Sequence, residues 1–306
     1  MAVKHFRSAK PLEPGAHVAL IAPAGPLQKP EDLPRAQENT RLLGWEPIVG
    51  SHATDRAGYL AGSDRDRLND INRALRDPKI DAIWCLRGGY GMMRILSGID
   101  YDALSRTPKV IIGYSDVTSL HAAVQRKCRL VTYHGPTARE PMTDLSRDSL
   151  RRAVVEQADS CGVAPNAREI NAGVAEGRLV GGNLAVLTSL CGTPFAPDLS
   201  DGILILEDIN EPVYRIDRML QQLKLAGAFN GCRAIVFGEC VKCPDDAGGG
   251  GRAFDEVLGE IAHSLGVPCL AGIPVGHIAE QWTIPLGAMA TIDTAKRSIT
   301  VNSYTS

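Results

Sequence analysis

The chain has 306 residues, enough for one large α/β domain or for two domains, and a hydrophobic content of 44%, typical of a globular protein. It carries 33 basic and 35 acidic residues, a net charge of −2, and only 5% of its residues are aromatic. The near-balance of charge argues against a general nucleic-acid binder with a basic surface, and the few aromatic residues disfavour a surface on which bases stack.

No apolar run reaches the roughly 18–20 residues that span a bilayer, and no apolar core of a secretory signal follows the charged N-terminus. We therefore expect a cytoplasmic protein whose eight cysteines are reduced thiols. Cys240 and Cys243 form a C-x-x-C pair, but neither a second such pair nor a histidine pair with zinc spacing accompanies it. The sequence thus predicts no metal site.

The first half of the chain alternates strand-like and helix-like segments. Apolar runs predict strands at residues 15–22, 45–49, 82–86 and 110–112, with a further strand ending before residue 135. Helices are expected between them at residues 30–43 and 64–75, the second with charged residues on a solvated face. This alternation predicts a parallel sheet with helices on both faces, in which ligands bind at the carboxyl ends of the strands.

Two loops at such strand ends carry the main chemical signals. Gly113 and Ser115 fit the G-x-S-x-G pattern of a nucleophile elbow, although Val117 occupies its last position. Taken alone, this stretch fits a Ser or Asp cap on an ordinary helix at least as well. The glycine cluster at residues 88–91 has neither the Gly-Lys-Ser/Thr of a phosphate loop nor a dinucleotide fingerprint. It is either a tight turn or a loop whose N–H groups face Ser115 and stabilise an oxyanion.

The second half of the chain is expected to form a separate domain. We expect an N-terminal α/β domain at residues 1–145, a polar linker region at 146–175 and a C-terminal domain at 176–306. In the last region, strands are predicted at residues 202–206 and 234–237, and helices at 184–190, 214–225 and 254–265. Residues 283–287, 290–293 and 298–301 are expected to be closing strands of an antiparallel kind.

Two polar residues in this second half complete a candidate site. Glu207 directly follows an apolar strand, and His277 ends a Gly-Pro-rich loop. Serine hydrolysis needs a nucleophile, a histidine that takes its proton and a carboxylate that orients the imidazole, and Ser115, His277 and Glu207 supply these types. Spacing alone leaves rivals open, namely Asp208 and Glu211 for the acid, and His121 and His134 for the base.

Six segments then occur in an order typical of one family: residues 21–26, 87–91, 113–118, 181–184, 206–218 and 272–277. On these segments the chain resembles, almost end to end, the LD-carboxypeptidases, a serine peptidase family that includes the microcin C immunity proteins. The resemblance implies an α/β fold, with an N-terminal parallel-sheet domain like that of class I glutamine amidotransferases and a C-terminal β-rich α/β domain. It also implies that no metal or cofactor is used and that the protein forms a homodimer.

The resemblance assigns roles to the candidate residues. Ser115 is the expected nucleophile, His277 the general base and acid, and Glu207 the orienting carboxylate. Backbone N–H groups of Gly89 and Asp116 are the expected oxyanion donors.

The family activity implied is removal of the terminal D-alanine from murein tetrapeptides during cytoplasmic wall recycling, through an acyl-enzyme. Arg87 is a candidate contact for the substrate carboxylate, although a structural ion pair explains it equally well, and Glu239 is a candidate for the free amine of the diamino acid. The expected partners are a murein tetrapeptide or related small peptide and a second copy of the chain, without nucleic acid or membrane.

Two alternatives remain. One is a microcin-type immunity or detoxifying peptidase that cleaves a peptidyl- or aminoacyl-nucleotide, and the aromatic shortage disfavours it because only Trp282 lies near a proposed site residue. The other is a non-catalytic muropeptide-binding protein, against which the presence of Ser115, Glu207 and His277 argues.

Overall fold

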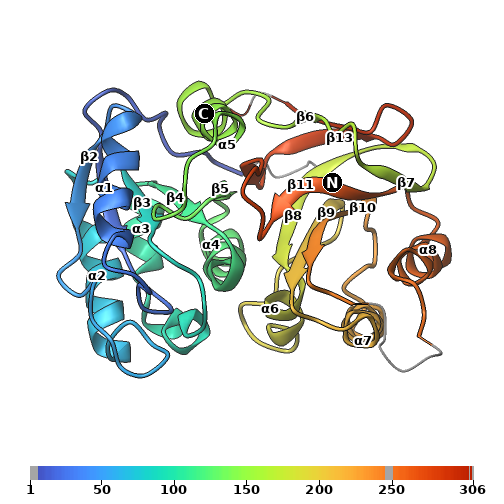
Figure 1. The fold of residues 1–306 in the computed structure, drawn as a ribbon, viewed down its shortest axis with the longest axis horizontal. Coiled ribbons are helices and arrows are strands. Elements are labelled where there is room, and N and C mark those ends of the chain that lie inside the picture. Colours follow the sequence, from blue (N-terminus) through green and yellow to red (C-terminus); the bar gives the residue numbers. More distant parts are fainter. Residues whose placement is uncertain (1–5, 245–250, 303, 305–306) are drawn as a thin grey trace.

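The computed structural model describes residues 6–244, 251–302 and 304, and places two sheets side by side (Figure 1). The smaller sheet has the strand order β12-β5-β4-β3-β1-β2. Its strands are β1 (His17–Ile21), β2 (Glu46–Val49), β3 (Ala82–Cys85), β4 (Val110–Gly113), β5 (Thr132–His134) and β12 (Ile284–Leu286). The strands β1 to β5 are mutually parallel, as expected from the alternation in the sequence, whereas β12 runs antiparallel to β5.

Helices cover both faces of the smaller sheet because successive strand residues face opposite sides. Along β1, Ile21 packs into a core with α2 and α4, while Leu20 packs into a second core with α1 and α5. The helices are α1 (Asp32–Leu42), α2 (Asp64–Arg76), α3 (Tyr101–Arg106), α4 (Thr118–Cys128) and α5 (Asp144–Arg151), the last running into a π turn at Arg152–Glu156. Short 3-10 turns lie at Met92–Arg94, Leu96–Gly98 and Ser115–Val117.

The larger sheet has the strand order β6-β14-β13-β8-β9-β10-β11-β7, and its four central strands β8 to β11 are parallel. Its strands are β6 (Gly162–Val163), β7 (Arg168–Asn171), β8 (Val174–Asn183), β9 (Gly202–Ile209), β10 (Ala234–Val241), β11 (Cys269–Gly276), β13 (Met289–Asp293) and β14 (Ser298–Val301). One face packs against α6 (Leu184–Ser189), α7 (Val213–Leu225) and α8 (Phe254–Leu265). Within the described residues, no helix has the length and apolar character needed to cross a membrane.

Two segments tie the halves of the chain together. Residues 146–175, expected as a linker, contain most of α5 and the strands β6 and β7, and both strands pair with the larger sheet. The expected closing strands divide between the sheets: β13 and β14 join the larger sheet, but β12 crosses back and pairs Ile284 with His134 of β5. The halves are therefore interlocked, with α4 between them (Figure 1).

The two halves of the chain also make a close contact where β8 ends, next to the start of α4. The backbone N–H of Asn183 donates to Thr118 Oγ1 at 3.0 Å, at the start of α4. Gly182, with φ +134°, lies against the same side chain, so that a Cβ on it would stand 2.5 Å from Thr118 Oγ1. Only glycine satisfies both the backbone angle and this approach.

We expect Gly182→Ala to lower the free energy of unfolding by about 2–4 kcal/mol, because it adds backbone strain and a clash with Thr118. Urea denaturation measures the change. The matched control is Gly192→Ala, where φ is also positive but no atom lies within 4 Å of the added Cβ, and we expect a loss of only about 1 kcal/mol. Equal losses in the two variants would contradict the close approach.

Candidate active site

The serine of the G-x-S motif lies on a strained turn between β4 and α4. Ser115 has φ +64°, in the left-handed region that residues with a side chain avoid, and a 3-10 turn carries the chain from it into α4. This is the strand–turn–helix geometry of a nucleophile elbow. Val117, the departure from the usual pattern, is buried against Gly113, where an added Cβ would lie 3.1 Å from both Val117 methyl groups. Because Gly113 has no side chain, it leaves space for the Val117 side chain.

The structure brings together the three residues proposed from the sequence as a triad. His277 Nε2 lies 3.2 Å from Ser115 Oγ, and His277 Nδ1 lies 2.8 Å from Glu207 Oε2. Ser115 follows β4 of the smaller sheet, whereas Glu207 lies in β9 and His277 follows β11 of the larger sheet. Glu207 is fully buried, while Ser115 and His277 are partly exposed. Ser115, His277 and Glu207 thus form a hydrogen-bonded row, which is the arrangement that activates a serine hydroxyl.

The surroundings of the imidazole raise the pKa of His277. Burial lowers the pKa of His277, but the Glu207 hydrogen bond and charge, together with the charges of Glu140 and Asp208, raise it above 6.5 overall. With Nδ1 donating to Glu207, Nε2 is the acceptor that faces the serine hydroxyl. The arrangement can therefore take a proton from Ser115 and stabilise the imidazolium that results.

The rival bases point elsewhere. His121 is buried, its Nε2 bonds to the Gly113 carbonyl at 2.8 Å, and burial lowers its pKa to about 4. His134 is buried in β5, and burial lowers its pKa well below 6.5.

The rival acids are also engaged elsewhere. The Asp208 carboxylate accepts from Asn183 Nδ2 and from the Ala185 N–H, and Glu211 lies 3.3 Å from Arg215. Among the three acids, the structure brings Glu207 to the imidazole nitrogen.

The glycine cluster packs directly against Ser115. A Cβ on Gly88 would lie 2.7 Å from Ser115 Cβ and 2.9 Å from its Oγ, so a larger residue would collide with the hydroxyl. The Gly25 N–H donates to the Gly88 carbonyl at 2.8 Å, and Gly89 has φ +97°. The cluster is thus a tight turn that also approaches the serine. The oxyanion roles of Gly89 and Asp116 stay predictions.

Two buried charged side chains, to which the sequence assigned no such role, hold these loops. The Asp116 carboxylate accepts the Met92 N–H at 2.8 Å, which fixes the glycine loop to the elbow. Arg67 Nη1 donates to the Pro23 carbonyl at 2.6 Å and to the Gly91 carbonyl at 2.8 Å. Arg67 was expected on a solvated helix face, yet it is only 1% exposed. Its Nη2 also pairs with Asp64, one turn earlier in α2. The helical periodicity does not predict the burial of Arg67, because burial depends on the carbonyl groups of two loops distant in the chain.

Arg87, proposed as a substrate contact, lies beside the glycine loop. Its Nη1 donates to the Pro26 carbonyl at 2.7 Å, and an added Cβ at Gly25 would stand 2.8 Å from that nitrogen. Burial, followed by the charge of Arg139, lowers the pKa of Arg87, and Arg56 acts in the same sense. The partner of Arg87, which the sequence left open, is therefore a backbone carbonyl. The charges of Arg139 and Arg56 also act on Arg87.

Glu239, the other proposed contact, is exposed. Its backbone is paired with Gly276, next to the histidine, and its charge helps to raise the pKa of Arg168, mainly a partner of Asp255. Among the described residues, no hydrogen bond joins its carboxylate to Ser115, Glu207 or His277.

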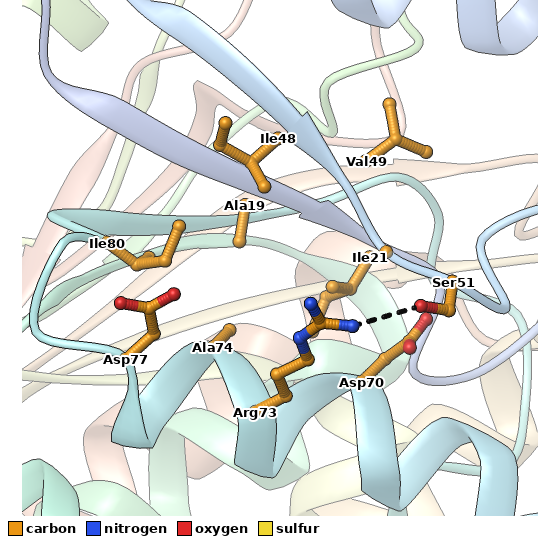
Figure 2. A pocket seen from close by; sticks show the side chains of 11 residues that line it. Ala19, Ile21, Ile48, Val49, Ser51, Asp70, Arg73, Ala74, Asp77 and Ile80 are labelled. Carbon is orange, nitrogen blue, oxygen red and sulfur yellow. Dashed lines mark hydrogen bonds between the residues drawn. The ribbon is translucent and has the colours of Figure 1, made fainter.

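A separate pocket of about 230 Å³ lies between the edge strand β2 and helix α2 (Figure 2). Arg73 reaches across it to Ser51 Oγ at 3.3 Å, between Asp70 and Asp77. None of the three residues of the hydrogen-bonded row lines this pocket. It is distinct from the site at the strand ends.

In the part of the chain that the structure describes, one cluster carries metal-type ligands. The ligand atoms of His52, Asp55 and Asp66 lie within 4.8 Å of one another. His52 Nδ1 donates to Asp55 Oδ2 at 2.8 Å, and Ser63 Oγ donates to Asp66 Oδ2 at 2.6 Å. These contacts account for the three side chains without an ion.

The chain matches two family models in succession. Residues 18–135 match the LD-carboxypeptidase N-terminal domain, and residues 176–292 match the LD-carboxypeptidase C-terminal domain. A protein of Bacillus subtilis named "Probable murein peptide carboxypeptidase" is 36% identical, with 95% of this chain and 93% of that protein covered. The murein tetrapeptide carboxypeptidase of Pseudomonas aeruginosa is 33% identical, with 90% and 92% covered.

Solved structures agree with this assignment. The structure of MccF in complex with glutamyl sulfamoyl guanosine superposes with a TM-score of 0.89 at 26% identity, covering 97% of this chain and 99% of that one. The muramoyltetrapeptide carboxypeptidase of Oxalobacter formigenes superposes with a TM-score of 0.83 at 28% identity, covering 95% and 100%. The expected two-part α/β fold is confirmed, and the chain belongs to the LD-carboxypeptidase family of serine-type carboxypeptidases.

Proposed function

We propose that this protein is a cytoplasmic LD-carboxypeptidase that removes the terminal D-alanine from murein tetrapeptides during cell-wall recycling, with Ser115, His277 and Glu207 as its triad. The observation that carries the proposal is the hydrogen-bonded row from Ser115 through His277 to Glu207, at 3.2 and 2.8 Å. The name of the Pseudomonas aeruginosa relative supports the choice of substrate. An intact, charged row also argues against a non-catalytic muropeptide binder.

The mechanism follows from the positions of the three side chains. Ser115 Oγ attacks the scissile carbonyl while His277 Nε2 takes its proton, and Glu207 stabilises the imidazolium through Nδ1. In this proposal the oxyanion forms against the N–H groups of Gly89 and Asp116, the residues that directly follow Gly88 and Ser115. His277 then protonates the amine of the leaving D-alanine, and water, activated by the same imidazole, hydrolyses the acyl-enzyme. No step calls for a metal or a cofactor.

The substrate ends in a carboxylate, which calls for a cationic pocket next to the oxyanion loop. Arg87 is our candidate, because it precedes Gly88, which touches Ser115, and because Arg139 and Arg56 add positive charge around it. Glu239 is the candidate partner for the free amine of the diamino acid, from the opposite sheet. We further propose that the protein acts as a homodimer.

A second candidate function is cleavage of an aminoacyl- or peptidyl-nucleotide. The MccF structure contains glutamyl sulfamoyl guanosine, and a nucleoside base needs an aromatic surface. Trp282 is buried and offers none, but Tyr59 and Tyr90 are exposed and pack edge to face with ring centroids 5.6 Å apart. Tyr90 follows Gly89 directly, so this pair is the feature that favours the second candidate.

Incubation with murein tetrapeptide should release D-alanine, measured by coupled oxidation of the free D-amino acid. Ser115→Ala should lower the rate on the order of 10⁴-fold or more, because the nucleophile is lost. Ser189→Ala, which removes an exposed hydroxyl on α6, should keep the wild-type rate. No release by the wild type, or undiminished release by Ser115→Ala, refutes the proposal. Faster cleavage of glutamyl sulfamoyl guanosine than of tetrapeptide would favour the second candidate.

The value of kcat/KM should rise with pH along a limb whose apparent pKa lies above 6.5. The neutral imidazole is the base, and the pKa of His277 is raised, so activity is lost as the pH falls through that pKa. Glu207→Gln removes the main stabiliser of the imidazolium, so the limb should move to lower pH while kcat falls about 10²–10⁴-fold. Glu211→Gln, whose parent carboxylate faces Arg215, should leave the limb in place. A limb that stays unmoved in Glu207→Gln would contradict this role.

Arg87→Gln should raise KM for tetrapeptide about 10–100-fold with a smaller effect on kcat, because a charged hydrogen bond to the substrate is lost. A substrate whose terminal carboxylate is amidated should bind the wild type weakly and lose nothing further in the variant. Arg73→Gln, in the separate pocket, serves as the control. Equal losses for the acid and the amide would show that Arg87 supports the loop rather than the substrate.

A further inference from the structure

A second, partly buried carboxylate lies behind the histidine of the row. Tyr114, the residue before the nucleophile, is 6% exposed, and its hydroxyl donates to Glu140 Oε1 at 2.7 Å. The Tyr114 ring packs against the His277 ring, with centroids 4.8 Å apart and planes at 62°. Tyr114 therefore joins Glu140 to the imidazole on the side of the smaller sheet, whereas Glu207 approaches from the larger sheet.

Further contacts hold Glu140 in place. Gln281 Nε2 lies 3.4 Å both from Glu140 Oε2 and from the carbonyl of Ile278, the residue after the histidine. Asn39 Nδ2 of α1 donates to the Glu140 carbonyl at 2.8 Å, so the backbone of this loop is also fixed. The loop that carries the histidine and the loop that carries Glu140 are thus linked through one amide side chain.

The partners of Glu140 are neutral donors. Among the described residues, no ion pair involves its carboxylate, and the neighbouring Arg139 lies 3.8 Å from Asp32 instead. Burial raises the pKa of Glu140, whereas the Tyr114 hydrogen bond, Arg139 and His277 counteract that rise. Partial removal of a carboxylate from water without a salt bridge is unfavourable, and the neutral donors offset part of that cost.

The groups that face His277 are all acidic or neutral. Glu207 and Asp208 come from β9, Glu140 from the loop after β5, and Tyr114 from the elbow. His134 of β5 also interacts with it, but burial keeps that imidazole neutral by lowering its pKa. Glu140 contributes after Glu207 to the raised pKa of His277. The negative charge near the imidazole therefore comes from both sheets.

We propose that Tyr114 and Glu140 form a positioning pair for His277, in which the phenol ring fixes the orientation of the imidazole and the Glu140 carboxylate stabilises its protonated form. The inference rests on the proposed function of His277 as the base. When the imidazole takes the Ser115 proton, positive charge appears between Glu207 and Glu140. Tyr114 holds the ring in line because its own hydroxyl is anchored on the second carboxylate.

The test is Glu140→Gln, which keeps the shape of the side chain and removes its charge. The pKa of His277, followed by NMR titration of its ring resonances, should fall by about half a pH unit or more. The acidic limb of kcat/KM should move by the same amount, and the plateau kcat should fall about three- to tenfold. Glu169→Gln is the matched control, because Glu169 also accepts a hydroxyl, that of Thr294 at 2.6 Å, and it should move neither quantity.

Two further variants separate charge from position. Glu140→Asp retains the charge but withdraws it from the phenol, so the pKa of His277 should stay near the wild-type value while kcat falls. Tyr114→Phe removes the hydroxyl that anchors the ring on Glu140, so kcat should fall while the pKa of His277 stays near the wild-type value.

An unchanged pKa of His277 in Glu140→Gln overturns the positioning pair, and so does a wild-type kcat in Tyr114→Phe. If Glu140→Gln fails to fold, Glu140→Asp and Tyr114→Phe still decide: a full wild-type kcat in both overturns it. The NMR titration needs no substrate. A shifted titration in a protein that releases no D-alanine would therefore refute the proposed function and leave the pair standing.

Discussion

The contact between Ser115 and His277 requires a fixed arrangement of the two sheets, because one residue follows a strand of each sheet. A hydrogen bond at 3.2 Å tolerates little relative movement of its two groups. The carboxyl ends of the parallel strands in the two sheets must therefore be held at a fixed distance from each other. Three features supply that rigidity: strand β12 crosses into the smaller sheet, Thr118 accepts the Asn183 N–H, and Gly182 allows the close approach. The site is precise because the halves are interlocked rather than joined by a simple linker.

Buried charged side chains also stabilise the loops of the site. Arg67 and Asp116 are almost fully buried, and each binds backbone groups of the loops around the nucleophile. Burial raises the pKa of Asp116 to about 6, and of Asp208 likewise to about 6. Such groups are costly to bury and are stabilised by their hydrogen bonds. The hydrogen bonds of these charged groups hold the loops in places where glycines and tight turns leave few side chains to pack.

Strain concentrates at the nucleophile itself. Ser115 adopts φ +64°, and the surrounding loops leave it little freedom, because Gly88 lies against its side chain and Asp116 is tied to Met92. The strain lifts the hydroxyl above the strand end, where the imidazole reaches it from the other sheet. The placement of Tyr114 just before this turn gives the phenol access to both the imidazole and Glu140.

The sequence by itself determined the elements and the chemical types at their ends. Apolar runs marked the parallel strands β1 to β5, β9 and β10, because local patterns report directly on strands and turns. Strand and loop ends made Ser115, Glu207 and His277 candidates, but rival acids and bases stayed open until the family resemblance assigned the roles. Only the tertiary structure decided that β12 belongs to the smaller sheet, that Arg67 is buried, and that Tyr114 and Glu140 lie behind the imidazole. These features depend on contacts between residues far apart in the chain, and no local pattern records which distant groups will meet.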